Sequence, residues 1–387
     1  MVKQMARILM ASGMVAGMSF GMPTYAGGWG TTGSVQLAGN YDDNARLSTL
    51  NVVSAASGSS DLSAKLLYQD DSFLCSINPR MLALRYDGDR TLNRTEGYLT
   101  LLARRTTETG SNSVSLAGTS DTTLTSELGT TGLSEINKQR RNVATTINTQ
   151  WDVTEKFSTS TQLYAAANRY IDAKQTGLVD YNYGSVLINS VYQWTNQSSL
   201  SLQASAGKLQ VPEYARLNKT NQSVTLGYVV QWSPQWSSNV SLGPSRIQTR
   251  SGTQSGSVYN IGFSREAERS MFSASVAREV TPNGFGSLSQ REKYQFNWNV
   301  QLTDRWSSNW SATAIRNENI AESGAPAGDR LTYSDISGSV TWRITPTWGT
   351  AFTIGQTRQR VGDNQTTAAR NHAVLSISWN GLLRQLH

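Results

Sequence analysis

Alternation of apolar and polar residues over segments of about ten residues limits the folds open to this chain more than any other feature. Between residues 293 and 302 the sequence reads KYQFNWNVQL, in which every second side chain is apolar and the others are polar. The same pattern recurs over residues 223–232 and 142–151. Successive side chains of a β-strand point to opposite faces, so each segment predicts a strand with one apolar and one polar face.

Three further observations favour a transmembrane barrel over a soluble β-sandwich. The polar faces carry mainly Ser, Thr, Asn and Gln, and the predicted strands are longer than most strands of soluble sheets. Short turns also alternate with long loops, as they do at the periplasmic and extracellular ends of an outer-membrane barrel. The predicted short turns lie near 69–72, 106–111, 152–156, 195–197, 233–235, 266–268, 303–305 and 345–347, and long loops include 120–138, 209–218 and 317–329.

The hairpin count predicts an all-β fold, a single transmembrane antiparallel up-and-down β-barrel of about 18 strands, with about 16 as the alternative. The chain would enter the barrel at Gly33 and return at Asn380. The two counts differ in the N-terminal third, where residues 47–56 fit either a loop or one more strand. Pro79 lies within the predicted strand at 73–86 and predicts a bulge or an edge distortion, because proline has no N–H to donate.

The first residues, MVKQMARILMASGMVAGMSFGMPTYAGG, are typical of a secretory signal peptide. They combine two cations with a short uncharged apolar run and then small residues, and the run is too short to span a bilayer as a helix. We place cleavage after Ala26, which leaves residues 27–387 as one barrel domain. The predicted location is therefore the outer membrane of a Gram-negative bacterium.

The overall composition agrees with this interpretation once the alternation is considered. A mean hydropathy of −0.40 resembles that of a soluble protein, but alternating strands cancel in such an average. Cys75 is the single cysteine, so no internal disulfide can form. The formal net charge of +7 is spread along the chain without a basic arm, so the sequence predicts no nucleic-acid partner.

Tryptophan is concentrated near the predicted short turns. In the segment WSPQW, two tryptophans flank a turn that contains Pro234, and their spacing puts both on the same face. A single tryptophan would indicate core packing, whereas a set placed in this way indicates an aromatic girdle at the periplasmic headgroup level. The predicted members are Trp151, Trp194, Trp232, Trp236, Trp306, Trp342, Trp348 and Trp379.

Strand side chains cannot fill a barrel of this size, so its interior should hold water unless a loop folds inward. The polar faces would then form a wall suited to hydrophilic solutes, sugars among them, although any water-filled barrel needs such a wall. Residues 120–138 are long enough to fold inward and constrict it. The candidate pore-lining residues are Lys65, Asn148, Gln150, Asn189, Gln203, Gln231, Lys293, Asn297, Asn299, Asp335 and Arg343.

Cations gather at the predicted extracellular ends of the strands. They would form either a basic mouth that attracts anionic solutes or a belt that meets the phosphates of the outer leaflet. The residues are Arg85, Arg140, Arg141, Arg169, Arg216, Lys219, Arg246, Arg250, Arg291, Arg316, Arg358, Arg360 and Arg370.

The sequence predicts no enzyme, cofactor or metal site. His372 and His387 are the only histidines, and no cluster of histidine and cysteine has the spacing of a zinc site. A surface hydrolase built on His372 with a loop acid such as Asp329 or Asp363 has no spacing motif to support it.

The segment YDDN at 41–44 follows an alternating strand shortly after the signal peptide, and it resembles the beta-barrel porin-2 type of outer-membrane protein. That resemblance implies a link to exopolysaccharide systems, in which such barrels help polymer to cross the outer membrane. Asp42, Asp43 and Asn44 also fit a simpler role as turn formers in the first loop, and they do not predict a calcium site.

The leading functional hypothesis from the sequence is an outer-membrane channel for hydrophilic material that takes part in exopolysaccharide export. One alternative is a general or solute-specific diffusion porin, and another is a structural or adhesive surface barrel with a plugged lumen. The expected partners are outer-membrane lipid, lipopolysaccharide, a polysaccharide substrate and periplasmic export components.

Overall fold

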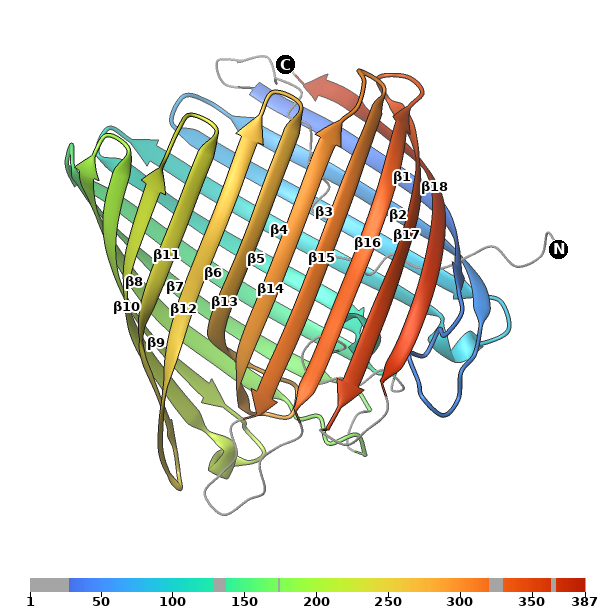
Figure 1. Ribbon diagram of the computed structural model, residues 1–387, viewed down its shortest axis with the longest axis horizontal. Coiled ribbons are helices and arrows are strands. Elements are labelled where there is room, and N and C mark those ends of the chain that lie inside the picture. The colour runs from blue at the N-terminus through green and yellow to red at the C-terminus, as the bar shows by residue number, and fades with distance from the viewer. Residues whose placement is uncertain (1–27, 128–136, 173–174, 320–329, 363–366, 387) are drawn as a thin grey trace.

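The computed structural model describes residues 28–127, 137–172, 175–319, 330–362 and 367–386, and these form one closed antiparallel sheet of 18 strands (Figure 1). Each strand pairs with the next along the chain, and β1 (Gly28–Asp42) closes the ring against β18 (Ala368–Leu386). The prediction of 18 strands is therefore confirmed, and the alternative of 16 is wrong. The predicted signal peptide lies outside the described residues.

The strands run to 13 or more residues each, and several begin or end beyond the predicted segments. Residues 43–54 form a loop, so the extra strand considered near residues 47–56 is limited to the start of β2. No helix among the described residues has the length and apolar character to cross a bilayer. The remaining strands are β2 (Ala55–Gln69), β3 (Phe73–Tyr86), β4 (Arg94–Thr107), β5 (Gly110–Thr122), β6 (Gln139–Thr154), β7 (Phe157–Tyr170), β8 (Tyr181–Thr195), β9 (Ser198–Gln210), β10 (Lys219–Gln231), β11 (Trp236–Thr249), β12 (Gly252–Ala267), β13 (Ser270–Pro282), β14 (Leu288–Gln301), β15 (Trp306–Asn319), β16 (Leu331–Arg343) and β17 (Trp348–Val361), and the short helices are η1 (Arg90–Leu92), α1 (Thr123–Ser126) and η2 (Ala215–Leu217).

All eight predicted short turns join strands at one end of the barrel, the upper end in Figure 1. We call it the periplasmic end, and the opposite end, which carries the long loops, the extracellular end. One connection departs from the rule, because β11 and β12 are joined at the extracellular end by residues 250–251 alone. The alternation of short and long connections was thus readable from the sequence with one exception.

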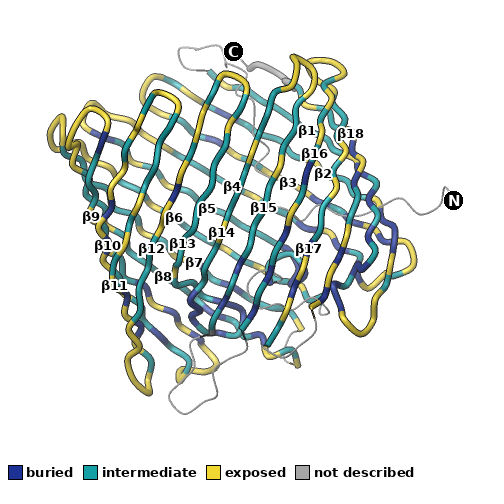
Figure 2. Tube along the Cα trace, in the orientation of Figure 1, coloured by how far each residue is buried: buried dark blue, intermediate teal, exposed yellow. Residues whose placement is uncertain are grey.

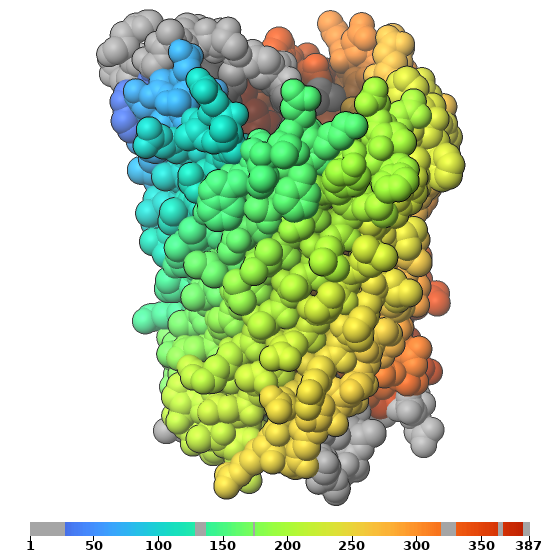
Figure 3. Space-filling model, turned by 90° about the vertical axis from the view of Figure 1, so that its left-hand side faces the viewer, coloured from blue at the N-terminus to red at the C-terminus, as the bar shows by residue number. Residues whose placement is uncertain are grey.

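The two faces of the wall differ as the alternation predicts. Leu62, Val143, Leu226 and Trp298 are among the large apolar side chains that stand 43–63% exposed, and the polar residues between them point into the barrel. The strands run obliquely around the wall and form a continuous surface (Figure 3). A closed barrel with an apolar exterior is the β-structure that a bilayer accepts, so the protein is an outer-membrane barrel.

Pro79 does not create a bulge. The ladder between β2 and β3 lacks pairs at Asn78 and Pro79, but the register is the same on both sides of the gap. A second gap lies between β10 and β11 opposite Pro244, again without a register shift. Each proline therefore removes local pairing and leaves the strand in place, because proline lacks only its own donor.

Gly243 is the residue that lets β10 and β11 approach beside Pro244. A Cβ added at Gly243 would stand 1.7 Å from the carbonyl oxygen of Val224 and 2.7 Å from the Cα of Thr225, both in backbone. We expect Gly243→Ala to destabilise the barrel by about 1–3 kcal/mol, since overpacking forces a backbone shift. Denaturant unfolding in detergent measures the effect, and Gly262→Ala, which meets the side chain of Asn239 instead, should cost less.

Buried residues gather toward the extracellular end, the lower end in Figure 2. Within the described part of the chain they form three small apolar clusters, each of which joins loop residues to the inner wall. A pore with loops extended into water would not bury residues there. The extracellular mouth is therefore the part of the barrel whose packing calls for explanation.

Candidate functional site

The first long loop, residues 43–54, crosses part of the mouth as a strap. Leu47 is 3% exposed and packs against Ile315, Tyr333 and Ala368 on the inner wall of β15, β16 and β18. Ala45, two residues earlier, belongs to a different cluster, which lies beside η1 and α1. The backbone of Leu47 is left-handed, with φ of 49°, a conformation that a branched side chain rarely adopts outside constrained sites.

The YDDN motif fixes this strap to β18. The carboxylate of Asp43 accepts hydrogen bonds from the backbone nitrogen and side-chain amide of Asn371, at 2.7 and 2.6 Å. The side-chain amide of Asn44 donates to the carbonyl oxygens of Ser48 and Ala369, at 2.8 and 3.0 Å. These contacts support the simpler interpretation of Asp43 and Asn44 as turn formers, with the addition that the turn is directed inward.

The hairpin of β13 and β14 also folds into the mouth. Its pairing with β12 ends at Tyr259 and Arg278, but β13 and β14 remain paired as far as Pro282 and Leu288. Beyond the last pair with β12, this hairpin tip leans onto the inner wall. Leu288 is fully buried in a cluster with Tyr181, Leu209, Val211 and Ile247, from β8, β9, β11 and the loop after β9.

The tip meets segments from the far side of the ring. The carbonyl oxygen of Gly284 accepts a hydrogen bond from the backbone nitrogen of Val179, 2.9 Å away. A Cβ at Gly284 would lie 2.8 Å from the hydroxyl of Tyr170 and 2.9 Å from the carboxyl carbon of Glu127. Glu127 follows α1 at the end of β5, which stands diametrically opposite β14 in the ring. The contact between Glu127 and Gly284 therefore spans the lumen.

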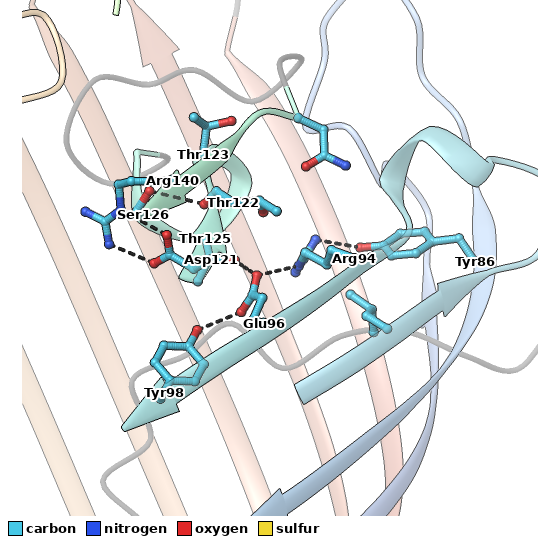
Figure 4. Close-up of polar contacts among 12 residues, drawn as sticks. Tyr86, Arg94, Glu96, Tyr98, Asp121, Thr122, Thr123, Thr125, Ser126 and Arg140 are labelled. Carbon is cyan, nitrogen blue, oxygen red and sulfur yellow. Dashed lines mark hydrogen bonds and ion pairs between the residues drawn. The ribbon is translucent and has the colours of Figure 1, made fainter. Parts of the chain in front are cut away.

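Segment 123–127 is held in the mouth by buried charges (Figure 4). The hydroxyl of Thr125 in α1 donates to the carboxylate of Glu96, which is fully buried on β4. Glu96 also accepts from the hydroxyl of Tyr98 at 2.7 Å and pairs with Nε of Arg94 at 3.0 Å. Arg94 is itself almost fully buried, so each charge depends on its partner for solvation.

Two further contacts hold the same segment. Arg140 pairs with Asp121 through two hydrogen bonds of 2.9 and 2.7 Å, which joins β5 to β6 at the base of the segment (Figure 4). The hydroxyl of Tyr170 donates to the carboxylate of Glu127 at 2.5 Å. The predicted constriction loop at 120–138 is thus folded inward where it is described, while residues 128–136 lie outside the described part.

The strap has a pH-sensitive anchor outside the membrane-spanning strands. Arg46 pairs with Asp89 at 2.7 Å. Burial would raise the pKa of Asp89, but hydrogen bonds from Thr91 and Arg46 outweigh it and hold the pKa below its ordinary value. The anchor is therefore fully present above the ordinary aspartate pKa and is lost as pH falls through the lowered one.

We expect the strap to stay anchored at neutral pH and to loosen only in acid below the usual aspartate range. In the Asp89→Asn variant the strap should be loosened at every pH, because the amide cannot form the ion pair. Current noise in single-channel recordings as a function of pH provides the measurement. If the current noise of the Asp89→Asn variant still rises in acid as it does in the wild type, the pair of Arg46 and Asp89 is not the pH-sensitive anchor.

All eleven candidate pore-lining residues occupy inward positions of their strands. This placement follows from the alternation with exposed apolar neighbours such as Ile188, Leu202 and Tyr294. Asp335 stands apart from the others, because it is 7% exposed at the mouth and accepts a hydrogen bond from Thr357 at 2.7 Å. That these residues line a conducting path stays a prediction.

The eight predicted girdle tryptophans all lie at the periplasmic end on the outward face. Trp306 and Trp342 face each other across β15 and β16 and stack at 5.7 Å with an angle of 9° between their planes. In WSPQW, the backbone nitrogen of Trp232 donates to the carbonyl oxygen of Trp236 at 2.9 Å. Sequence reasoning missed Trp29, which lies at the same level and packs on Tyr68, because β1 begins earlier than predicted.

The strand residues of the predicted basic mouth divide into two sets, whereas Arg216 lies in η2 and Arg250 in the turn between β11 and β12. Arg140, Lys219, Arg291 and Arg370 point inward, where Arg140 pairs with Asp121, Lys219 donates to Ser287 and Arg370 lies 3.6 Å from Asp42. The outward set consists of Arg85, Arg141, Arg169, Arg246, Arg316, Arg358 and Arg360. The inward cations are thus partly neutralised, and the outward ones face the surroundings of the barrel.

His372 lies on the inner side of β18 near the extracellular end. Asp329 and Asp363, the acids considered with it, lie outside the described residues.

The comparisons with known proteins concern the fold alone. No family model matches the chain, and no curated protein does, so the YDDN resemblance to the porin-2 type has no support beyond the motif itself. Among solved structures, OccK2 (OpdF) of Pseudomonas aeruginosa is 10% identical, with 92% of this chain and 98% of that chain covered and a TM-score of 0.50. OccAB4 of Acinetobacter baumannii is 9% identical, with 94% and 100% covered and a TM-score of 0.48. The copper transporter OprC is 9% identical, with 93% and 81% covered and a TM-score of 0.49.

Proposed function

We propose that this outer-membrane barrel is a diffusion channel for small hydrophilic solutes. The observation that carries the proposal is the contact across the mouth, where the hairpin tip at Gly284 meets Glu127 and Val179 from the opposite side. Inward folding of this kind narrows a wide barrel at one level and leaves the polar wall below it open. Small solutes pass such a constriction, whereas a polymer needs the crossing segments to move aside.

Exopolysaccharide export, the leading hypothesis from the sequence, is the less favoured of the two transport functions. It rests on the YDDN motif, and the contacts of Asp43 and Asn44 account for that motif as the anchor of the strap. A wide unobstructed lumen would favour polymer passage, and the mouth does not provide one. A plugged structural barrel remains as the competing non-transport function.

Reconstitution into planar bilayers tests the proposal. We expect discrete conductance steps in potassium chloride and uptake of small sugars in a liposome-swelling assay that declines steeply with solute size. Absence of conductance in every condition would favour the plugged barrel. If gene deletion abolished surface polysaccharide while small-solute uptake stayed unchanged, export would be restored as the function.

The paired charges of the inner wall predict weak ion selectivity. Four inward ion pairs neutralise one another, namely Asp42 with Arg370, Asp61 with Arg80, Glu96 with Arg94 and Asp121 with Arg140. A ring of one sign would concentrate counter-ions, whereas a balanced wall does not. Lys65, Lys293 and Arg343 also point inward and outnumber Asp335, so we expect a small preference for anions in a salt gradient, and a strong preference for either ion would contradict the neutralisation by these pairs.

A further inference from the structure

An apolar groove lies on the outward face of the barrel over β12 to β16. It encloses about 470 Å³ and is lined almost entirely by apolar atoms. Large and small side chains alternate across neighbouring strands, so that Phe263, Ala274, Phe296, Ala312 and Ile336 follow one another in a single row. The small side chains Ala274 and Ala312 leave an empty space between the larger side chains of Phe263, Phe296 and Ile336. On a barrel wall this groove faces the lipid.

A row of polar residues lies directly on the extracellular side of the groove. Cross-strand pairing aligns Tyr259, Arg278, Glu292, Arg316, Thr332 and Arg360 on successive strands from β12 to β17. They share the outward face with the groove. On β12 to β16 each lies an even number of residues from a groove residue of its own strand, and Arg360 on β17 pairs directly with Thr332 of this row. Three guanidinium groups therefore stand beside one carboxylate at the level where the chain leaves the apolar zone.

The neighbouring acids do not neutralise this row. Glu292 accepts from Tyr259 at 3.3 Å and lies 4.0 Å from Nε of Arg278, and a terminal nitrogen of Arg278 donates to the buried Gln290. Arg316 bonds Glu318 at 3.1 Å, but Glu318 is shared with Arg330. Arg358 and Arg360 on β17 are exposed. The row keeps an excess of positive charge on a surface that borders the membrane.

We propose that this face binds a phosphate-bearing acylated lipid of the outer leaflet, with an acyl chain in the groove and the phosphate on Arg316 and Arg360. Guanidinium groups bind phosphate oxygens in pairs, and the apolar lining matches hydrocarbon. Charge complementarity favours a lipid over a second copy of this chain, because a two-fold contact through this face would bring like-charged rows together. The site does not depend on whether the barrel conducts.

The wall on the other side of the barrel provides a matched control. Arg141 and Arg169 pair directly across β6 and β7 on the outward face, and none of the residues that line the groove lies on these two strands. If outward arginines bound lipid phosphate regardless of the groove, both places would contribute equally. If the groove and the arginines act together, only the β12 to β16 face contributes a saturable site.

The test uses the purified full barrel in detergent with lipid A as the probe, and bound lipid is counted by native mass spectrometry. Three variants are compared with the wild type: Ala312→Trp, which fills the groove, Arg316→Gln with Arg360→Gln, which removes charge, and Arg141→Gln as the control. We expect about tenfold weaker binding or more for the first two and unchanged binding for the third, since the first loses burial of the acyl chain and the second loses charge-assisted hydrogen bonds to the phosphate. Migration of the unheated barrel in gels confirms folding, and Ala274→Phe replaces any groove variant that fails to fold.

Three results would overturn the proposal. Wild-type binding by Ala312→Trp would show that the groove is not used. If inorganic phosphate alone bound to the wild type as well as lipid A does, the site would be an anion site that holds no acyl chain. Crosslinking that places a second copy of the chain over the groove would make the face a subunit interface. A non-conducting barrel that still binds lipid A leaves the lipid site supported while the channel function fails.

Discussion

Removal of the inward hairpin tip should raise the single-channel conductance severalfold. In this variant residues 281–289 are replaced by Asn-Gly, which joins Val280 to Gln290, a pair already opposite in the register. An Asn-Gly turn suits a two-residue hairpin, and the wall should survive because pairing with β12 ends at Arg278. The change removes Gly284 and Leu288, so the contacts that cross the lumen are lost.

The control for this variant is the β11–β12 turn, which also lies at the extracellular end. Replacing its residues by Arg250→Asn and Ser251→Gly alters an exposed two-residue turn, and we expect unchanged conductance. If trimming the tip leaves both conductance and its noise unchanged in a folded barrel, the tip does not limit flow. The strap would then be tested in the same way through Leu47→Gly, which removes the side chain packed against the inner wall of β15, β16 and β18.

The wall was predictable from the sequence because its signal is local and repeated. Alternation in KYQFNWNVQL assigns faces to β14 without knowledge of any partner strand, and each short turn places the next strand beside the last. The same logic placed Trp232 and Trp236 together on the outward face. The strand count followed from the turns, and its uncertainty was confined to residues 47–56, where the polar loop mimics a weakly alternating strand.

The mouth was not predictable in the same way, because it depends on contacts between residues far apart in the chain. Leu47 and Leu288 are apolar side chains beside loops, and nothing local indicates that one packs on β15 and the other on β8 and β9. Glu96 and Asp121 sit at inward positions of ordinary strands, so alternation assigns their face but not their burial. A partial signal existed: an apolar residue within a polar loop of a barrel is a candidate for inward folding.

The cations predicted at the extracellular strand ends divide between the two sides of the wall. The side that a cation faces depends on whether it stands at an odd or an even position of its strand. Arg140 and Arg141 are neighbours in sequence and point to opposite sides of the wall. A list based on strand ends alone mixes residues that anchor the mouth with residues that face lipid. Sorting the same list by parity would have separated the two sets before the structure was known.

Loss of the Glu96 carboxylate should be the most damaging single change in the mouth. Glu96 is fully buried and accepts from Tyr98 and Thr125 while it pairs with Arg94, whose side chain is 2% exposed. Breaking a buried pair by removing one partner leaves an uncompensated charge and costs about 3–5 kcal/mol. We expect Glu96→Ala to lower the denaturant midpoint of the folded barrel and to release α1, with larger and noisier currents.

Replacing both partners distinguishes the charge from the packing. The double variant Arg94→Leu with Glu96→Leu leaves no isolated charge, so we expect it to be less destabilised than Glu96→Ala, because buried ion pairs can often be exchanged for apolar residues at little cost. Its currents should nevertheless remain noisy, since Thr125 loses the acceptor that holds α1 (Figure 4). The double variant would thus recover stability but not quiet currents. If instead its currents became quieter in step with its recovered stability, the pair would act through general packing of the mouth and not through the anchor on Thr125.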